Sequence, residues 1–234
     1  MTVTPFIGVL QLDTRFPRPV GDIGNPNSFG FPIRTAIVRG VTAVAAVRGE
    51  ANALLAPFVS AAQQLVDSGA VAIATSCGFL APMQRALAAA VPVPVATSAL
   101  LQVAWVLPML APRRRVGVLT IDADSLHTSH LAAVGAPADT PVQGLPRNGA
   151  LASTVFGDRP CIDRRQVRGE VVVAARRLLA RHPEVGAIVL ECTNLPPYRR
   201  AIVAALGLPV FDCNTMLHFL WLAAGSVRRP DSAR

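Results

Sequence analysis

Two short stretches of the chain carry a cysteine in a setting that suits acid–base chemistry. They are residues 74–79 (Ala-Thr-Ser-Cys-Gly-Phe) and residues 190–195 (Leu-Glu-Cys-Thr-Asn-Leu). Each ends a short apolar run and precedes a helix-like segment, which is typical of a buried parallel strand followed by a turn and a helix. Amides and the dipole at a helix start lower the pKa of a thiol and can hold a carboxylate. We therefore predict that Cys77 and Cys192 are reactive thiols at strand ends.

The two cysteines occupy equivalent places in a repeated unit. Each is followed 17 residues later by a Pro-Val pair, at residues 94–95 and 209–210. Upstream, residues 7–13 resemble residues 116–122, so three landmarks recur in the same order. The chain therefore reads as a duplicated α/β unit with one cysteine in each half.

Strands that alternate with helices predict mainly parallel sheets covered on both faces. We predict two pseudo-symmetric α/β subdomains at residues 1–112 and 113–226, with a cleft between them and a frayed tail at residues 227–234; the last helix of the first half can cross over. The predicted strands are residues 6–13, 71–76, 93–96, 115–121, 186–190 and 208–211, with a short one near residue 142. The predicted helices are residues 50–68, 79–90, 98–110, 122–134 (capped by Asp122 or Asp124), 166–181 and 214–224.

The predicted fold brings the two thiols together. Ligands of open parallel sheets sit at the carboxyl ends of the strands, and a duplication would set one thiol on either side of a bound molecule. One thiolate can then remove a proton from a carbon beside a carboxylate while the opposite thiol returns one. Fixed donors can stabilise the developing charge without a cofactor. The candidate binding residues at these strand ends are Asp13, Ser76, Gly78, Thr120, Thr193 and Asn194.

The composition excludes several other classes of protein. The net charge is +8, but all 22 basic residues are arginines scattered along the chain, with one Tyr and two Trp to stack on bases. We therefore expect no nucleic-acid partner. Without lysine, the chain lacks the Schiff-base residue of pyridoxal phosphate enzymes and the lysine of a phosphate-binding loop. No strand leads into a Gly-x-Gly-x-x-Gly run, so we expect no cofactor.

The remaining cysteines and the histidines give no metal pattern. The four cysteines lack the paired short spacing of zinc sites, and Cys161 and Cys213 are expected to be small buried residues. His127 and His130 lie three residues apart without an obvious third ligand, so we predict no metal.

The longest uncharged run, residues 86–112, contains four prolines. It therefore suits a helix, a strand and a second helix better than a membrane span. No signal peptide is visible, so we expect a cytoplasmic protein without a membrane partner.

One long segment, residues 14–34, contains too many prolines and glycines for a helix or a strand. Loops of this length in compact domains are usually functional or disordered. Phe16, Phe29 and Phe31 would let this one pack, so we predict a folded lid at the carboxyl end of the first strand.

With these residues the chain resembles the aspartate/glutamate racemase superfamily, which includes hydantoin racemases, maleate isomerases and arylmalonate decarboxylases. The resemblance covers nearly the whole chain, and its marks are residues 75–78, residues 192–194 and a first strand that ends in Asp13 and Thr14. It implies two similar α/β subdomains, a site between them and the paired cysteines as catalytic acid and base. It also implies that Thr14 and Thr75 contact the substrate and that the protein is a homodimer.

The resemblance does not name the substrate. Glutamate racemases have a Cys-Thr-His triplet in the second half, whereas this chain has Asn194 in place of the histidine and Glu191 where a small residue precedes the cysteine. The family's decarboxylases keep one of the two cysteines; both are present here, which favours an isomerase.

We therefore predict a cofactor-independent racemase or epimerase of amino acid metabolism, acting on an amino acid or a related small carboxylate. Two alternatives remain. One is a cis–trans isomerase of a small unsaturated diacid, and the other is a non-catalytic protein that binds small acids on the same scaffold.

Overall fold

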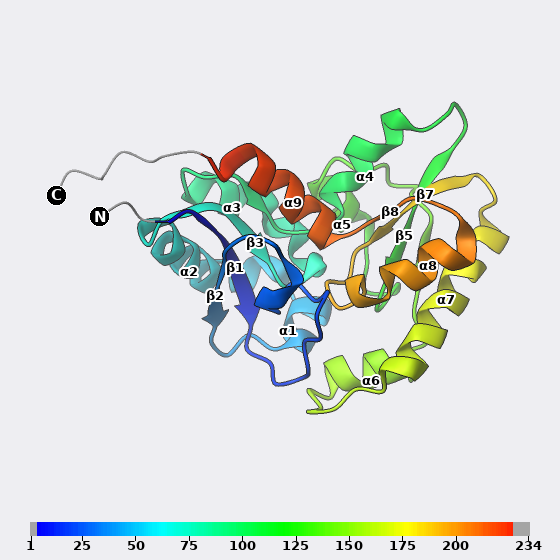
Figure 1. Ribbon diagram of the computed structural model, residues 1–234, viewed down its shortest axis with the longest axis horizontal. Helices are drawn as coiled ribbons and strands as arrows, with labels where there is room; N and C mark the ends of the chain where they lie inside the picture. The colour runs from blue at the N-terminus through cyan, green and yellow to red at the C-terminus, as the bar shows by residue number, and fades with distance from the viewer. Residues whose placement is uncertain (1–3, 227–234) are drawn as a thin grey trace.

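The structure contains two parallel four-stranded sheets surrounded by helices (Figure 1). It is a computed structural model that describes residues 4–226. The first sheet has the order β2-β1-β3-β4 and the second the order β6-β5-β7-β8, and every pairing described is parallel. The strands are β1 (Phe6–Leu12), β2 (Ile33–Val38), β3 (Ala70–Thr75), β4 (Val95–Ala96), β5 (Arg115–Thr120), β6 (Val142–Gly144), β7 (Val185–Leu190) and β8 (Val210–Phe211). The predicted α/β fold with two similar parallel sheets is therefore confirmed.

The two sheets share a local irregularity as well as their strand order. Where β1 pairs with β3, the register shifts between Phe6 and Ile7, and where β5 pairs with β7, it shifts between Arg115 and Val116. A shift after the first residue of the corresponding strand in both halves supports the duplication that we inferred from the spacing of the cysteines.

Helices of the two halves flank the sheets in similar ways. The long helices α2 and α7 pack against the strands of the first and second sheet respectively. Among residues 4–226, no helix is long and apolar enough to cross a membrane. The helices are α1 (Ala43–Arg48), α2 (Leu55–Asp67), α3 (Gln84–Ala90), α4 (Leu101–Val106), α5 (Thr128–Ala133), α6 (Ala150–Phe156), α7 (Arg164–Arg181), α8 (Arg199–Leu206) and α9 (Cys213–Ala224).

Each half contributes a helix to the other half. Cys213, Met216 and Leu217 of α9 lie in a buried cluster with Ile7 and Ala74 of the first sheet, and Figure 1 shows α9 beside β3. In return, α4 contacts β7. This exchange ties the halves together, and the boundary between residues 112 and 113 stays a prediction. The predicted tail, residues 227–234, lies outside the described residues.

Several short elements were missed by the sequence analysis. They are β2, α1, α6 and α8, which lie in segments that we left unassigned or predicted as loops. β2 is an edge strand in which Arg34, Thr35 and Ile37 are exposed, so it lacks the apolar run of a central strand. The missed helices have six to eight residues. Helices this short depend on tertiary packing more than on their own sequence.

Several predicted helix starts differ from the structure; the helices expected from residues 50 and 98 begin at Leu55 and Leu101. The helix expected at residues 79–90 begins as the 3-10 helix Gly78–Met83, which contains Pro82, and α3 starts only at Gln84. Capping of the helix after β5 by Asp122 or Asp124 is wrong. The N-cap of α5 is His127 instead, and its backbone N–H donates a hydrogen bond to Nδ1 of His130 at 3.1 Å.

The loop between β1 and β2, residues 13–32, is folded, as we predicted. Its rings pack on the last helix: Phe31 is stacked on Trp221 with centroids 5.1 Å apart and meets His218 edge-on at 5.1 Å. Inside the loop, Asp22 is fully buried and pairs with Arg18 at 3.1 Å. We refer to residues 13–32 as the cover loop.

Candidate active site

Cys77 and Cys192 border the same small cavity, which we call the thiol cavity. Cys77 follows β3 and Cys192 follows β7 by two residues, so each lies at the carboxyl end of a central strand. The space between the side chains is about 20 Å³, which is close to the room that one water molecule needs. The cavity is lined by Leu12, Phe16, Ala43, Val47, Ser76, Cys77, Gly78, Phe79, Ile121, Val155, Glu191, Cys192, Thr193 and Asn194.

The buried Thr75 stabilises the turn that carries Cys77. Thr75 donates from Oγ1 to the carbonyl oxygens of Cys77 at 3.0 Å and Thr97 at 2.6 Å. Ser76 accepts a hydrogen bond at Oγ from the backbone N–H of Leu12 at 3.1 Å. Thr75 therefore supports the turn from outside the cavity, whereas Ser76 lines it.

The turn that carries Cys192 is bonded to the first turn and to the cover loop. Thr193 donates from Oγ1 to the carbonyl oxygen of Ser76 at 2.6 Å. Asn194 donates from Nδ2 to Oδ2 of the buried Asp22 at 2.6 Å, and its Oδ1 lies 3.6 Å from the sulfur of Cys192. Through Asn194, the second cysteine turn therefore holds the cover loop over the cavity.

Both thiols are more basic than the sequence analysis predicted. Burial raises the pKa of Cys77 to about 12, and it raises the pKa of Cys192 well above its usual value; the charge of Glu191 adds to both shifts. Hydrogen bonds from the backbone amides of Phe79 and Asn194 oppose these shifts. The expectation that helix-start amides lower the thiol pKa is wrong for the closed cavity, because desolvation outweighs the amides.

Glu191 is the site residue whose role the sequence analysis missed. Its side chain is fully buried and lines the cavity next to both cysteines. Oε2 accepts a hydrogen bond from Oγ1 of Thr120 at 2.7 Å. Thr120 is also buried, and it contacts Glu191 but does not line the cavity, although we predicted it as a binding residue. The sequence does contain a signal for this residue, because a glutamate directly follows the apolar run of β7.

Two other candidates lie outside the residues that border the cavity. Asp13 accepts a hydrogen bond from the backbone N–H of Gly40 at 3.0 Å, and its Oδ1 lies 3.7 Å from Arg39. Thr14 accepts from Arg18 at 3.0 Å. The structure therefore brings Ser76, Gly78, Thr193 and Asn194 to the thiols, and leaves Asp13 and Thr14 at the base of the cover loop.

The described histidines and the other two cysteines do not line the thiol cavity. Among the described residues, no three His, Cys, Asp or Glu side chains are grouped so that they could hold a metal ion. His130 packs edge-on against Phe79, and burial lowers its pKa. Cys213 is buried, as expected, whereas Cys161 is exposed, which corrects the expectation that it is buried.

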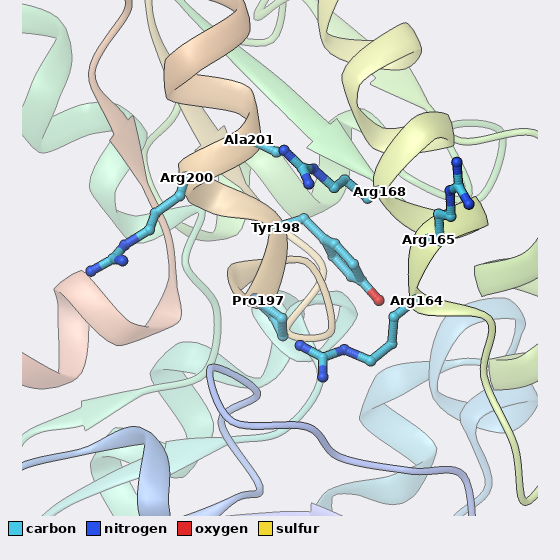
Figure 2. Close-up of a pocket in the computed structure, with 7 residues that line it drawn as sticks. All are labelled: Arg164, Arg165, Arg168, Pro197, Tyr198, Arg200 and Ala201. Atoms are coloured by element: carbon cyan, nitrogen blue, oxygen red, sulfur yellow. The ribbon is translucent and has the colours of Figure 1, made fainter.

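A larger pocket lies on the surface between α7 and α8 (Figure 2). It measures about 510 Å³ and is lined by Arg164, Arg165, Arg168, Pro197, Tyr198, Arg200 and Ala201. Figure 2 shows the Tyr198 ring near Arg164, while Arg200 extends away from it. No thiol lines this pocket. Its arginines form an exposed basic surface, and the two thiols line the smaller thiol cavity instead.

Comparisons with known proteins place this fold. No protein-family model matches the chain. The chain is 30% identical to dimethylsulfoniopropionate lyase 7 of Emiliania huxleyi (strain CCMP1516), over 91% of its own length and 66% of that protein. The seven curated relatives found are 26% to 31% identical to the chain, and all are named dimethylsulfoniopropionate lyases. The chain spans only 46% to 59% of the length of three of them.

Solved structures share the fold over nearly the whole chain. A mutant of arylmalonate decarboxylase in a sulfate-associated form has a TM-score of 0.64 at 20% identity and covers 98% of both chains. A glutamate racemase from Bacillus anthracis has a TM-score of 0.58 at 16% identity, over 93% of this chain and 81% of the racemase.

Proposed function

Because the chain has the fold of the aspartate/glutamate racemase superfamily, we propose that it is a cofactor-independent enzyme. In this proposal it removes a proton from a carbon next to a carboxylate or carbonyl group, with Cys77 and Cys192 as the acid–base pair. One observation carries the proposal: two thiols from equivalent strand ends of the two halves border one buried cavity. A binding protein would not need two such groups in one site.

The basicity of the thiols suits the removal of a carbon-bound proton. A base is more effective when its conjugate acid has a high pKa, because carbon next to a carboxylate is a very weak acid. Burial keeps both groups as thiols in the closed site, while the amides of Phe79 and Asn194 favour the thiolate. The proposed two-base reaction requires that one of these cysteines is a thiolate and the other a thiol when the substrate is bound.

The walls of the cavity favour a small acid with one carboxylate. The side chains around the thiols are mostly apolar and include Phe16, Phe79 and Val155, and no residue that the structure describes around the cavity is Arg or Lys. Arg18 of the cover loop acts on Cys77 but is already paired with the buried Asp22, so a second carboxylate would lack a free cation at the cavity wall, which argues against a dicarboxylic amino acid as the substrate.

Racemisation or epimerisation is the outcome that two thiols support best. The thiolate on one side takes the proton, and the thiol on the other side returns its own proton to the opposite face of the carbon. The exchange leaves the two sulfurs with their protonation states reversed, ready for the other enantiomer.

β-Elimination is the second candidate, and the curated relatives favour it because they are named lyases. Its first step is the same removal of the proton next to the carboxylate. If the neighbouring carbon carries a dimethylsulfonium group, the electrons of the broken C–H bond form a carbon–carbon double bond. The carbon–sulfur bond breaks, dimethyl sulfide leaves as a neutral molecule and acrylate remains. This reaction needs one thiolate and no proton from the second thiol.

A single set of incubations in deuterated water tests the proposal. Single enantiomers of small amino acids and hydantoins are followed by proton NMR for loss of the α-hydrogen signal and by optical rotation for inversion. Dimethylsulfoniopropionate is incubated in parallel and dimethyl sulfide is measured in the gas phase. Racemisation predicts exchange with inversion, whereas elimination predicts dimethyl sulfide. If small acids bind but neither reaction nor exchange occurs, the binding-protein alternative is favoured.

A further inference from the structure

Glu191 has a buried carboxyl group for which the two-thiol reaction has no use. The side chain is 0% exposed, and it is one of the residues around the thiol cavity. Oε2 is satisfied by the hydroxyl of Thr120, but Oε1 has no hydrogen-bond partner among the described residues. A buried oxygen without a partner is costly, so an unsatisfied atom on a residue that lines the thiol cavity points to a ligand that completes it.

The first half of the chain is shaped to admit this carboxyl group. A Cβ added to Gly78 would lie 2.4 Å from Oε1 of Glu191 and 2.3 Å from its carbonyl oxygen, closer than real side-chain atoms approach. Gly78 directly follows Cys77, and Glu191 directly precedes Cys192. The carboxyl group therefore lies against the bare backbone of the first cysteine turn while belonging to the second.

The environment of Glu191 favours its neutral form. Burial raises the pKa of Glu191 to about 8, and the hydrogen bond from Thr120 only partly opposes that shift. Since Oε2 accepts from Thr120, the proton of the neutral acid belongs on Oε1, on the side without a partner. A neutral carboxylic acid in an apolar cavity can act as a hydrogen-bond donor.

Few charged groups face Glu191. The two thiols are the titratable groups beside it, and its charge would raise the pKa of each. Beyond them, the cover loop contributes Arg18 and Asp22, which act on the thiols with opposite signs. Since the loop brings one charge of each sign, the protonation state of Glu191 is governed mainly by burial.

We propose that Glu191 is a third catalytic residue, which donates a hydrogen bond from Oε1 to the carboxylate of the substrate while a thiolate removes the neighbouring proton. The inference rests on the proposed function. When the C–H bond breaks, its electron pair moves into the bond to the carboxyl carbon and a second negative charge develops on the carboxylate oxygens. The proton stays bonded to Glu191 and is shared with the oxygen that gains charge. When carbon is protonated again, or a leaving group departs, the charge returns and the hydrogen bond relaxes.

Two substitutions separate this role from a structural one. Glu191→Gln keeps an N–H donor and an oxygen for Thr120 but cannot ionise, and Glu191→Leu removes the donor. We expect Glu191→Leu to lower kcat by about 100-fold or more, the usual loss for one donor to a developing oxyanion, whereas Glu191→Gln loses less than tenfold. Activity of the unmodified enzyme relative to that of Glu191→Gln should fall above about pH 8 as Glu191 ionises, because both proteins gain thiolate alike as the pH rises. Glu184→Gln is the matched control, because Glu184 directly precedes β7 whereas Glu191 directly follows it.

Binding distinguishes failure of this inference from failure of the proposed function. Propionate affinity, measured by calorimetry, should weaken about tenfold in Glu191→Leu, the scale of one hydrogen bond to a carboxylate. It should fall above pH 8 in the unmodified protein but not in Glu191→Gln. If no substrate reacts and propionate still behaves in this way, the proposed reaction is wrong but the role of Glu191 as a carboxylate donor holds. Equal kcat, pH profile and propionate affinity in all variants would overturn the inference.

Discussion

Thr193 donates a hydrogen bond from its hydroxyl to the carbonyl oxygen of Ser76 at 2.6 Å. Thr193 directly follows one cysteine and Ser76 directly precedes the other, so this buried bond joins the two thiol turns across 117 residues of chain. It fixes the two turns relative to each other, which a reaction with a base on either side of one carbon requires.

Replacement of Thr193 by Val removes that link while keeping the side-chain volume. The carbonyl of Ser76 would lose the hydroxyl as a donor, so we expect stability to fall by about 1–3 kcal/mol and kcat to fall with it. Thr193→Ser should restore most of both losses, because it keeps the hydroxyl. Urea unfolding and initial rates measure the two effects. Equal stability and rate in the Val and Ser variants would contradict this role.

The two cysteines should differ in the enantiomer that each serves. In a racemase, Cys77→Ser and Cys192→Ser each abolish inversion in both directions. Each variant should still exchange the α-hydrogen of at most one enantiomer with deuterated solvent, and the two variants should choose opposite enantiomers. Proton NMR measures the exchange.

In a lyase the same variants should behave asymmetrically. One substitution should abolish release of dimethyl sulfide, and the other should leave part of it, because elimination needs a single base. Cys161→Ser is the control, since Cys161 is exposed and does not line the cavity. Near-normal activity in both single variants would rule out cysteine acid–base chemistry.

The buried acid should make stability depend on pH. Glutamate has a pKa near 4.5 when unfolded, and burial raises the pKa of Glu191 to about 8 in the folded protein. Between these values the folded protein keeps a proton that the unfolded chain has lost. The contribution of Glu191 is therefore complete below pH 4.5 and falls as the pH rises to 8, by up to about 1.4 kcal/mol per pH unit.

Glu191→Gln should remove this slope. The measurement is urea unfolding at pH 5, 7 and 9, with the free energies of the two proteins subtracted at each pH. Glu50→Gln, at an exposed position, is the control and should keep the slope of the unmodified protein. A constant difference between the unmodified protein and Glu191→Gln would mean that Glu191 is already ionised in the folded state.

Addition of one methyl group at Gly78 should disturb the site. Its Cβ would lie 2.3 Å from a backbone oxygen of Glu191, which cannot swing away as a flexible side chain can. We expect Gly78→Ala to lower the free energy of unfolding by about 1–3 kcal/mol and to lower activity.

Gly169→Ala is the control and should raise the free energy of unfolding. Gly169 lies inside α7 and nothing is within 4 Å of its added Cβ, and alanine stabilises a helix by about 0.5–1 kcal/mol over glycine. Thermal unfolding compares the two.

Loosening the cover loop should expose the thiols. Asn194 bonds to the buried Asp22 of that loop at 2.6 Å, and the cavity beneath it is too small for a substrate. Asn194→Ala should therefore speed the alkylation of Cys77 and Cys192 by iodoacetamide, followed by mass spectrometry of each peptide. Alkylation of Cys161, which is already exposed, should not change. If all three rates stay the same, Asn194 does not hold the loop closed.

The sequence by itself determined the parallel strands other than β2, the duplication and the placement of Cys77 and Cys192 at strand ends. These features follow from local pattern, because a strand buried on both faces must be an apolar run, and polar residues can begin only where the strand ends. The pairing of Thr193 and Asn194 with the thiols follows in the same way, from adjacency in the chain.

The tertiary structure alone decided the elements and properties that depend on distant neighbours. Edge strand β2 and the short helices are held by packing rather than by their own pattern, and α9 covers the sheet of the opposite half. The raised pKa of both thiols and the protonation of Glu191 depend on how completely other segments exclude water. The degree of desolvation cannot be deduced from neighbours along the chain, because it depends on everything that surrounds a group in three dimensions.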